Sequence, residues 1–290
     1  MAGDAEQQLR AYVEYFRDMG IHDFYRRGEP LAIEAIETAA VITTASAEPS
    51  PMAFETAPVP PPVVATAVPS SHSVQEPVIS KLISFNELAP LPQAPIPVAE
   101  REAAMQAIRD EIGDCTRCPL AYAGRRNIVF GDGNPGARLM FVGEGPGADE
   151  DASGVPFVGK AGQLLNNMIG AMGLKREEVY IANIVKCRPP ANRVPEPVEA
   201  NTCAQFLVKQ IDVVQPEVIV ALGATAATYL LGVKQSLASL RGTWHSCRGA
   251  KVAVTYHPAF LLRDPRQKGE AWKDLQRVMA EMGLKPPAKA

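Results

Sequence analysis

Residues 137–145 read ARLMFVGEG, an apolar run that leads directly into a glycine-rich turn. Three more short runs rich in β-branched residues follow: VYIANIV at 179–185, EVIVALG at 217–223 and KVAVTYHP at 251–258. Helix-like patterns lie between and after these runs, at 161–173, 197–214, 224–231 and 269–282. Strands that alternate with helices predict an α/β fold, here a three-layer αβα sandwich with a central, mainly parallel four-stranded sheet.

Polar residues stand where these predicted strands end. Glu144 follows the first run, Asn183 lies at the end of the second, and His257 follows the fourth. In open sheets of this kind, ligands bind beyond the carboxyl ends of the strands. The sequence therefore predicts a site built from these three side chains.

The N-terminal third has a different composition. Residues 49–97 hold 12 of the 26 prolines and none of the 22 glycines. Proline fixes φ and removes a backbone donor, so we expect a Pro/Ala-rich flexible linker over 29–100. Ahead of it, the spacing of apolar residues predicts a short amphipathic helical segment over 1–28. We expect a disordered N-terminal arm whose helix tethers an unidentified protein, and a folded domain over 101–290.

Composition limits the class of protein. The chain has 290 residues, 47% of them hydrophobic and 21% charged, and a formal net charge of −3. No run approaches the ~20 apolar residues of a membrane span, and MAGDAEQQLR lacks the features of a signal peptide. These features indicate a cytoplasmic protein with no membrane partner, and we expect a monomer.

The cysteines indicate a metal site. Cys115 and Cys118 form a C-x-x-C pair, and Cys187 and Cys203 follow further along the chain. Four thiolates suit either a tetrahedral zinc or an iron–sulfur cluster, and the spacing alone favours neither. A third interpretation treats Cys187 and Cys203 as small buried apolar residues. Cys247 has no evident partner.

Several motifs in order resemble one known family. GEGPGADEDASGVPFVGKAGQLLNNMI at 143–169, NIVKCRPPANRVP at 183–195, HPAFLLR at 257–263 and WKDLQ at 272–276 resemble the family 4 uracil-DNA glycosylases. That family removes uracil from DNA by hydrolysing the N-glycosidic bond. The resemblance implies the uracil-DNA glycosylase fold, uracil-containing DNA as the partner, and a [4Fe–4S] cluster on Cys115, Cys118, Cys187 and Cys203.

The resemblance also assigns roles in catalysis. Phe157 matches the position that stacks on the flipped base, and Asn183 matches the amide that reads the uracil edge. His257 matches the donor to uracil O2, where negative charge accumulates as the bond breaks. Glu144 is the candidate carboxylate that orients water or stabilises the sugar cation. Gly145 belongs to the predicted uracil-binding loop, at a position where the family 1 enzymes carry Asp.

Further positions are expected to contact DNA. HPAFLLR resembles the loop that enters the minor groove, and within it Leu261 is the predicted wedge and Arg263 a predicted DNA contact. Lys160, at the start of a predicted helix, is a candidate phosphate contact, as are Lys186 and Arg193. The acidic run Asp149–Asp151 is interpreted as a solvated loop.

We considered three alternative functions for this sequence. The first is a homologue that binds uracil-DNA covalently, but its Gln at the position of Gly145 and its KRRIH insertion are absent here. The second is a catalytically silent DNA-binding or polymerase-associated protein, and the third is an electron-transfer protein. Glu144, Phe157, Asn183 and His257 occur together, which favours the glycosylase over both.

Overall fold

The structure is a computed structural model that describes residues 82–285. The predicted helical segment 1–28 and residues 29–81 of the predicted linker lie outside the described residues. Among residues 82–285, no helix has both the length and the apolar character needed to cross a membrane.

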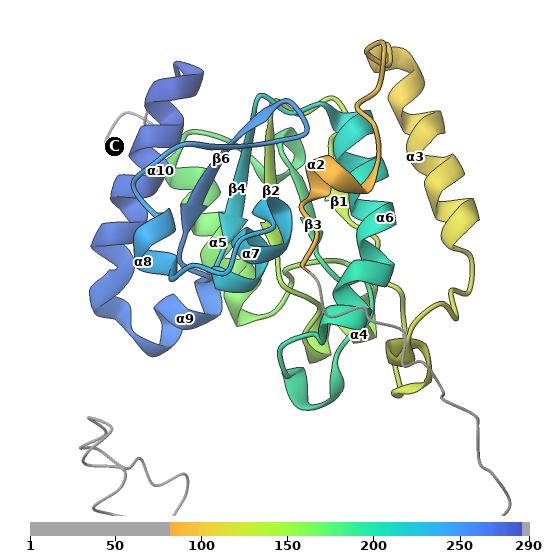
Figure 1. The fold of residues 1–290 in the computed structure, drawn as a ribbon. Coiled ribbons are helices and arrows are strands. Elements are labelled where there is room, and N and C mark those ends of the chain that lie inside the picture. The colour runs from red at the N-terminus through yellow and green to blue at the C-terminus, as the bar shows by residue number, and fades with distance from the viewer. Residues whose placement is uncertain (1–81, 286–290) are drawn as a thin grey trace, which may run out of the picture. The chain divides into compact units, whose positions relative to one another are not determined.

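A mixed sheet forms the centre of the fold, in the order β1-β3-β2-β4-β6-β5 (Figure 1). Its four parallel strands are the four predicted runs: β2 (Leu139–Gly143), β3 (Tyr180–Asn183), β4 (Val218–Leu222) and β6 (Ala250–Thr255). All residues of β2, β3 and β4 are buried, as expected for parallel strands covered on both faces.

Two short antiparallel strands extend the predicted four-stranded sheet at its edges. β1 (Asp132–Gly133) pairs with β3, and β5 (His245–Cys247) pairs with β6. Arg248 and Gly249 connect β5 to β6 and both have positive φ, which suits a tight two-residue hairpin. These strands were missed because two or three residues are too few to show an alternating pattern.

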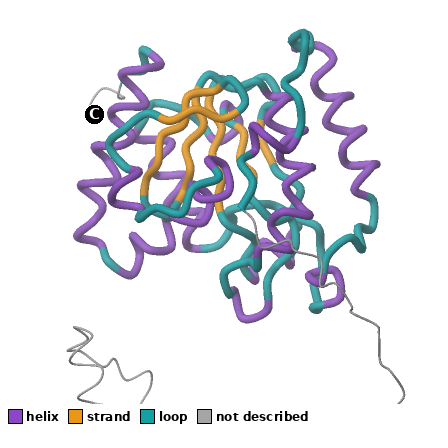
Figure 2. The backbone as a smooth tube through the Cα atoms, in the orientation of Figure 1, coloured by secondary structure: helices purple, strands orange, loops and turns teal. Residues whose placement is uncertain are grey.

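Helices cover both faces of the sheet (Figure 2). Alternate strand residues divide between two cores: Met140 and Val142 pack on one side with residues of α3, α6 and α7, and Leu139 and Phe141 pack on the other with residues of α5 and α10. The α-helices are α2 (Phe85–Leu88), α3 (Val98–Ile112), α4 (Ala148–Ser153), α5 (Lys160–Ala171), α6 (Pro197–Val214), α7 (Ala224–Leu231), α8 (Leu237–Leu240), α9 (Pro258–Arg263) and α10 (Lys268–Met282). The 3-10 turns are η1 (Pro119–Tyr122), η2 (Arg176–Glu178), η3 (Pro190–Asn192) and η4 (Pro265–Gln267). The predicted αβα sandwich is therefore confirmed.

The folded part begins earlier than residue 101. Phe85 of α2 is only 1% exposed and belongs to the core. Arg248 donates hydrogen bonds to the carbonyls of Phe85, Ala89 and Pro90. The predicted linker is therefore wrong for residues 82–100, because one buried guanidinium fastens this proline-rich stretch to the β5–β6 hairpin.

Candidate active site

A cavity of about 430 Å³ opens at the carboxyl ends of the parallel strands. Glu144 follows β2, Asn183 ends β3 and His257 follows β6, and all three line the cavity as predicted. Phe157 and Gly145 line it as well. The other lining residues are Pro146, Gly147, Glu150, Ala161, Pro189, Asn192, Arg193, Val194, Ala259 and Arg263.

Asn183 carries an unsatisfied polar atom. Its side chain is 1% exposed, and its Oδ1 is buried without a hydrogen-bond partner in the described part of the chain. Such an atom costs ~1–3 kcal/mol unless a ligand supplies a donor. A Cβ on Gly143 would lie 2.4 Å from this oxygen and 2.6 Å from the Phe157 ring, so only glycine lets both side chains approach β2 here.

Phe157 adopts a backbone conformation that is rare for a bulky residue. Its φ is +53°, its side chain is mostly buried, and its ring centroid lies 5.6 Å from that of His257. A positive φ in a non-glycine residue is strained, and persists only where neighbouring contacts enforce it. The ring is thus held at the cavity wall by its surroundings.

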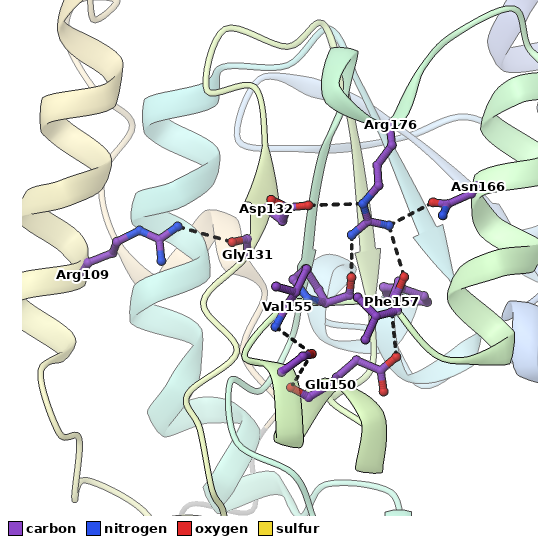
Figure 3. Close-up of polar contacts among 11 residues, drawn as sticks. Arg109, Gly131, Asp132, Glu150, Val155, Phe157, Asn166 and Arg176 are labelled. Carbon is purple, nitrogen blue, oxygen red and sulfur yellow. Dashed lines mark hydrogen bonds and ion pairs between the residues drawn. The ribbon is translucent and has the colours of Figure 1, made fainter.

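Arg176 supplies part of that support (Figure 3). Its guanidinium donates to the carbonyl oxygens of Pro156 at 2.6 Å and Phe157 at 3.2 Å, and to the side chains of Asn166 and Asp132. Several donors in one planar group fix the peptide on which Phe157 stands. Arg176 lies outside the sequence motifs, so no local pattern predicts its role.

Glu150 holds the other side of the same loop. One carboxylate oxygen accepts from the backbone N–H groups of Val158 and Gly159, and the other accepts from Gly147 at the start of α4. The interpretation of residues 149–151 as a solvated loop is therefore wrong for Glu150, and also for Asp151, which is 3% exposed. A glutamate three residues after the residue that precedes a helix is a capping signal that could have identified it.

His257 is neutral by virtue of its surroundings. Its Nδ1 accepts a hydrogen bond from the backbone N–H of Ala259 at 3.1 Å, so in the neutral ring the proton is on Nε2. Burial lowers its pKa to about 4, and the positive charge of Arg263 acts in the same direction. At neutral pH the ring is an uncharged hydrogen-bond donor.

Glu144 is half-buried at the cavity wall, and its Oε2 accepts a hydrogen bond from Thr225 Oγ1 at 2.5 Å. The next residue, Gly145, has no room for a side chain, because a Cβ there would lie 2.8 Å from Val185 Cγ2. The Asp that family 1 carries at this position would not fit this backbone without a shift. Glu144 is consequently the carboxylate of the cavity that directly follows β2.

The predicted DNA contacts have mixed outcomes. Lys160 is exposed at the first turn of α5, and Arg263 lines the cavity. Leu261 is 1% exposed and part of the interior, whereas the neighbouring Leu262 is 43% exposed. The prediction of Leu261 as the wedge is therefore wrong, because α9 turns that side chain inward.

The two other candidate phosphate contacts, Lys186 and Arg193, are both bonded to protein groups. Lys186 is 1% exposed, and its Nζ donates to the Asn183 carbonyl and to Gln210 Oε1, so it is unavailable to a phosphate. Arg193 lines the cavity, and its guanidinium pairs with both oxygens of the buried Glu199.

The four candidate cysteines influence one another. Burial raises the pKa of Cys118 and Cys187 and raises that of Cys203 to about 12, and neighbouring thiols of the set add to each shift. Three of the sulfurs have donors: Arg117 to Cys115, Arg125 to Cys187 and the Lys186 N–H to Cys203. No three His, Cys, Asp or Glu side chains of the described residues are arranged around a single metal ion.

Comparison with known proteins agrees with this geometry. Residues 130–276 match the Uracil DNA glycosylase superfamily. Type-4 uracil-DNA glycosylase of Thermotoga maritima is 48% identical over 185 residues, which cover 62% of this chain and 92% of that protein. The Type-4 enzymes of Archaeoglobus fulgidus and Pyrobaculum aerophilum are 40% and 42% identical, over 61% and 59% of this chain and 92% and 91% of their own lengths. The chain therefore belongs to the uracil-DNA glycosylase superfamily.

Proposed function

We propose that the protein is a monofunctional hydrolase that removes uracil from DNA and leaves an abasic site, as base excision repair of deaminated cytosine requires. The observation that carries the proposal is the buried, unpartnered Oδ1 of Asn183 in a cavity that also holds Phe157 and His257. Uracil offers an N–H donor beside a carbonyl acceptor, and one carboxamide satisfies both. Cytosine presents the opposite pattern and leaves the amide unsatisfied.

Base flipping precedes the chemistry. A stacked base cannot reach the cavity, and its extrusion costs a few kcal/mol. The exposed Leu262 directly precedes Arg263, which lines the cavity, so α9 offers the DNA an apolar side chain next to a cation. Phe157 then offers its ring to the flipped base.

Bond cleavage uses His257 and Glu144. The neutral imidazole donates from Nε2 to uracil O2, and this bond strengthens as negative charge develops on the departing base. Glu144 accepts a proton from the attacking water or stabilises the positive charge on the sugar. The two groups act on opposite charges of the same transition state.

We propose that Cys115, Cys118, Cys187 and Cys203 hold a [4Fe–4S] cluster. Buried thiols are costly to ionise, and a cluster supplies the positive charge that stabilises four thiolates. The donors on three of the sulfurs suit thiolate ligands. Hydrolysis transfers no electrons, so a cluster on these cysteines would serve to join the 115–118 segment to α6.

The test is release of uracil from a defined oligonucleotide, followed by alkaline cleavage of abasic sites. Asn183→Ala and His257→Ala should each lower the rate by ~100-fold or more while keeping the visible absorption of the cluster. Strand cleavage at the wild-type rate by both variants would contradict the pocket assignment. DNA left intact by the wild type would contradict the proposed function.

We further propose that residues 1–28 tether a partner protein and that the enzyme acts as a cytoplasmic monomer. Because Phe85 belongs to the core, a truncation should stop before residue 82. Deletion of residues 1–81 should leave excision from a short oligonucleotide within about twofold of the full chain, since the lining residues named above lie between Glu144 and Arg263. A large loss would contradict the tether proposal.

A further inference from the structure

Glu144 is linked to a residue that the cavity itself does not include. Thr225 Oγ1 donates to Glu144 Oε2 at 2.5 Å, although the two residues are 81 positions apart in the chain. Thr225 is absent from the lining of the cavity. A hydroxyl that donates to a carboxylate oxygen forms one of the stronger hydrogen bonds found in proteins.

The fold explains why the two meet. β4 lies beside β2 in parallel register, and α7 begins directly after β4, so the first turn of α7 stands beside the residue that follows β2. The backbone N–H of Gly223, between β4 and α7, donates to the Thr255 carbonyl at the end of β6. This bond fastens the start of α7 to the strand that leads to His257. Threonine is stiff at χ1, which restricts where its hydroxyl points.

We propose that Thr225 is a positioning residue that holds the Glu144 carboxylate in a fixed orientation for the glycosylase reaction. The inference rests on the proposed function. A proton acceptor and a stabiliser of a sugar cation both require a charged carboxylate at a fixed place.

The start of α7 also attracts the Glu144 carboxylate. The first turn of α7 carries the partial positive charge of a helix N-terminus. Tyr229 lies one turn further along α7 and is near Glu144; burial raises its pKa, and Glu199 and Glu144 add to the shift, so its phenol stays neutral. The charged and titratable side chains that share the cavity with Glu144 are those of Glu150, Arg193, His257 and Arg263.

Three variants test the hydroxyl. Thr225→Val keeps the shape and removes the donor, and its single-turnover rate should fall about 10- to 100-fold. Its Kd for DNA that carries non-hydrolysable 2′-fluoro-deoxyuridine should stay unchanged, because Thr225 does not line the cavity. Thr225→Ser restores the donor and should recover the rate to within about fivefold. Thr228→Val, the same change one turn along α7, is the matched control and should react at the wild-type rate.

A double-mutant cycle separates positioning from folding. In a Glu144→Gln background, Thr225→Val should cause little further loss, because the carboxylate that it holds is already gone. Equal losses in both backgrounds, or a serine variant as slow as the valine variant, would overturn the inference.

A crystal structure of Thr225→Val tests the same contact without any reaction. The Glu144 carboxylate should leave its place beside α7, and an unmoved carboxylate would overturn the inference. This readout stands apart from the proposed function, which fails instead if the wild type releases no uracil.

Discussion

The ring of Phe157 lies 5.6 Å from the ring of His257, with the two planes inclined by 33°. One residue comes from the loop after α4 and the other from the end of β6, and the cavity lies beside both. The proposed base platform, Phe157, and the proposed oxyanion donor, His257, therefore lie against each other. Disturbing the Phe157 loop should disturb catalysis at His257 as well.

Arg176 is predicted to support this pair of rings. Arg176→Ala should lower kcat/KM for uracil excision about 10- to 100-fold, because small misplacements of a positioning group are costly. In a Phe157→Ala background the same change should have little further effect. Arg138→Ala is the control: Arg138 forms an exposed ion pair with Glu217, and its loss should leave activity unchanged. Additive losses for Arg176 and Phe157 would show that Arg176 does not act through the platform.

His257 predicts a pH dependence of stability. Its pKa is about 4 in the folded protein and about 6.5 in an unfolded chain. Between these values the unfolded chain binds more protons than the folded one. The contribution of His257 to the free energy of unfolding therefore falls as pH drops below 6.5, and it is fully lost below 4. The variant His257→Gln has no titrating side chain at this position and should not lose stability in this way. Between pH 8 and pH 5 its stability relative to the wild type should improve by about 2 kcal/mol, measured by urea unfolding. An unchanged difference between the two pH values would contradict a histidine that stays neutral in the folded protein.

Substitutions of the adjacent Leu261 and Leu262 should have opposite effects on stability and activity. Leu262→Ala should slow excision from duplex DNA about tenfold, change excision from single strands much less, and leave Tm near the wild-type value, because the exposed side chain faces solvent. Leu261→Ala should lower the free energy of unfolding by ~2–5 kcal/mol, because it empties a buried site. The reverse pattern would identify Leu261 as the wedge after all.

Substitution of a candidate cluster ligand should remove the metal, and Cys247 offers an internal control. Cys118→Ser should lose visible absorption and most of the about four iron atoms expected per chain, and its Tm should fall. Cys247→Ala should keep both, because Cys247 is buried at the end of β5 and belongs to no donor set among the described residues. Elemental analysis that finds zinc in the wild type would favour the tetrahedral site and contradict the cluster.

The sequence by itself determined the layered fold and the three strand-end residues. The four apolar runs predict strands because parallel strands buried on both faces need continuous apolar residues. Glu144, Asn183 and His257 follow from this pattern, since parallel strands bring their carboxyl ends to one edge. Phe157 and the four cysteines needed the family resemblance as well, because their neighbours in space come from distant parts of the chain.

Tertiary structure alone decided which groups support the site. Leu261 and Leu262 are identical in type, and only the packing of α9 against α5 buries one and exposes the other. Lys186 is a cation in a motif, yet the fold encloses it against Gln210. Arg176 and Thr225 reach the site through contacts across 19 and 81 positions. A local pattern cannot encode such contacts, because they depend on where separate elements lie once the whole core has packed.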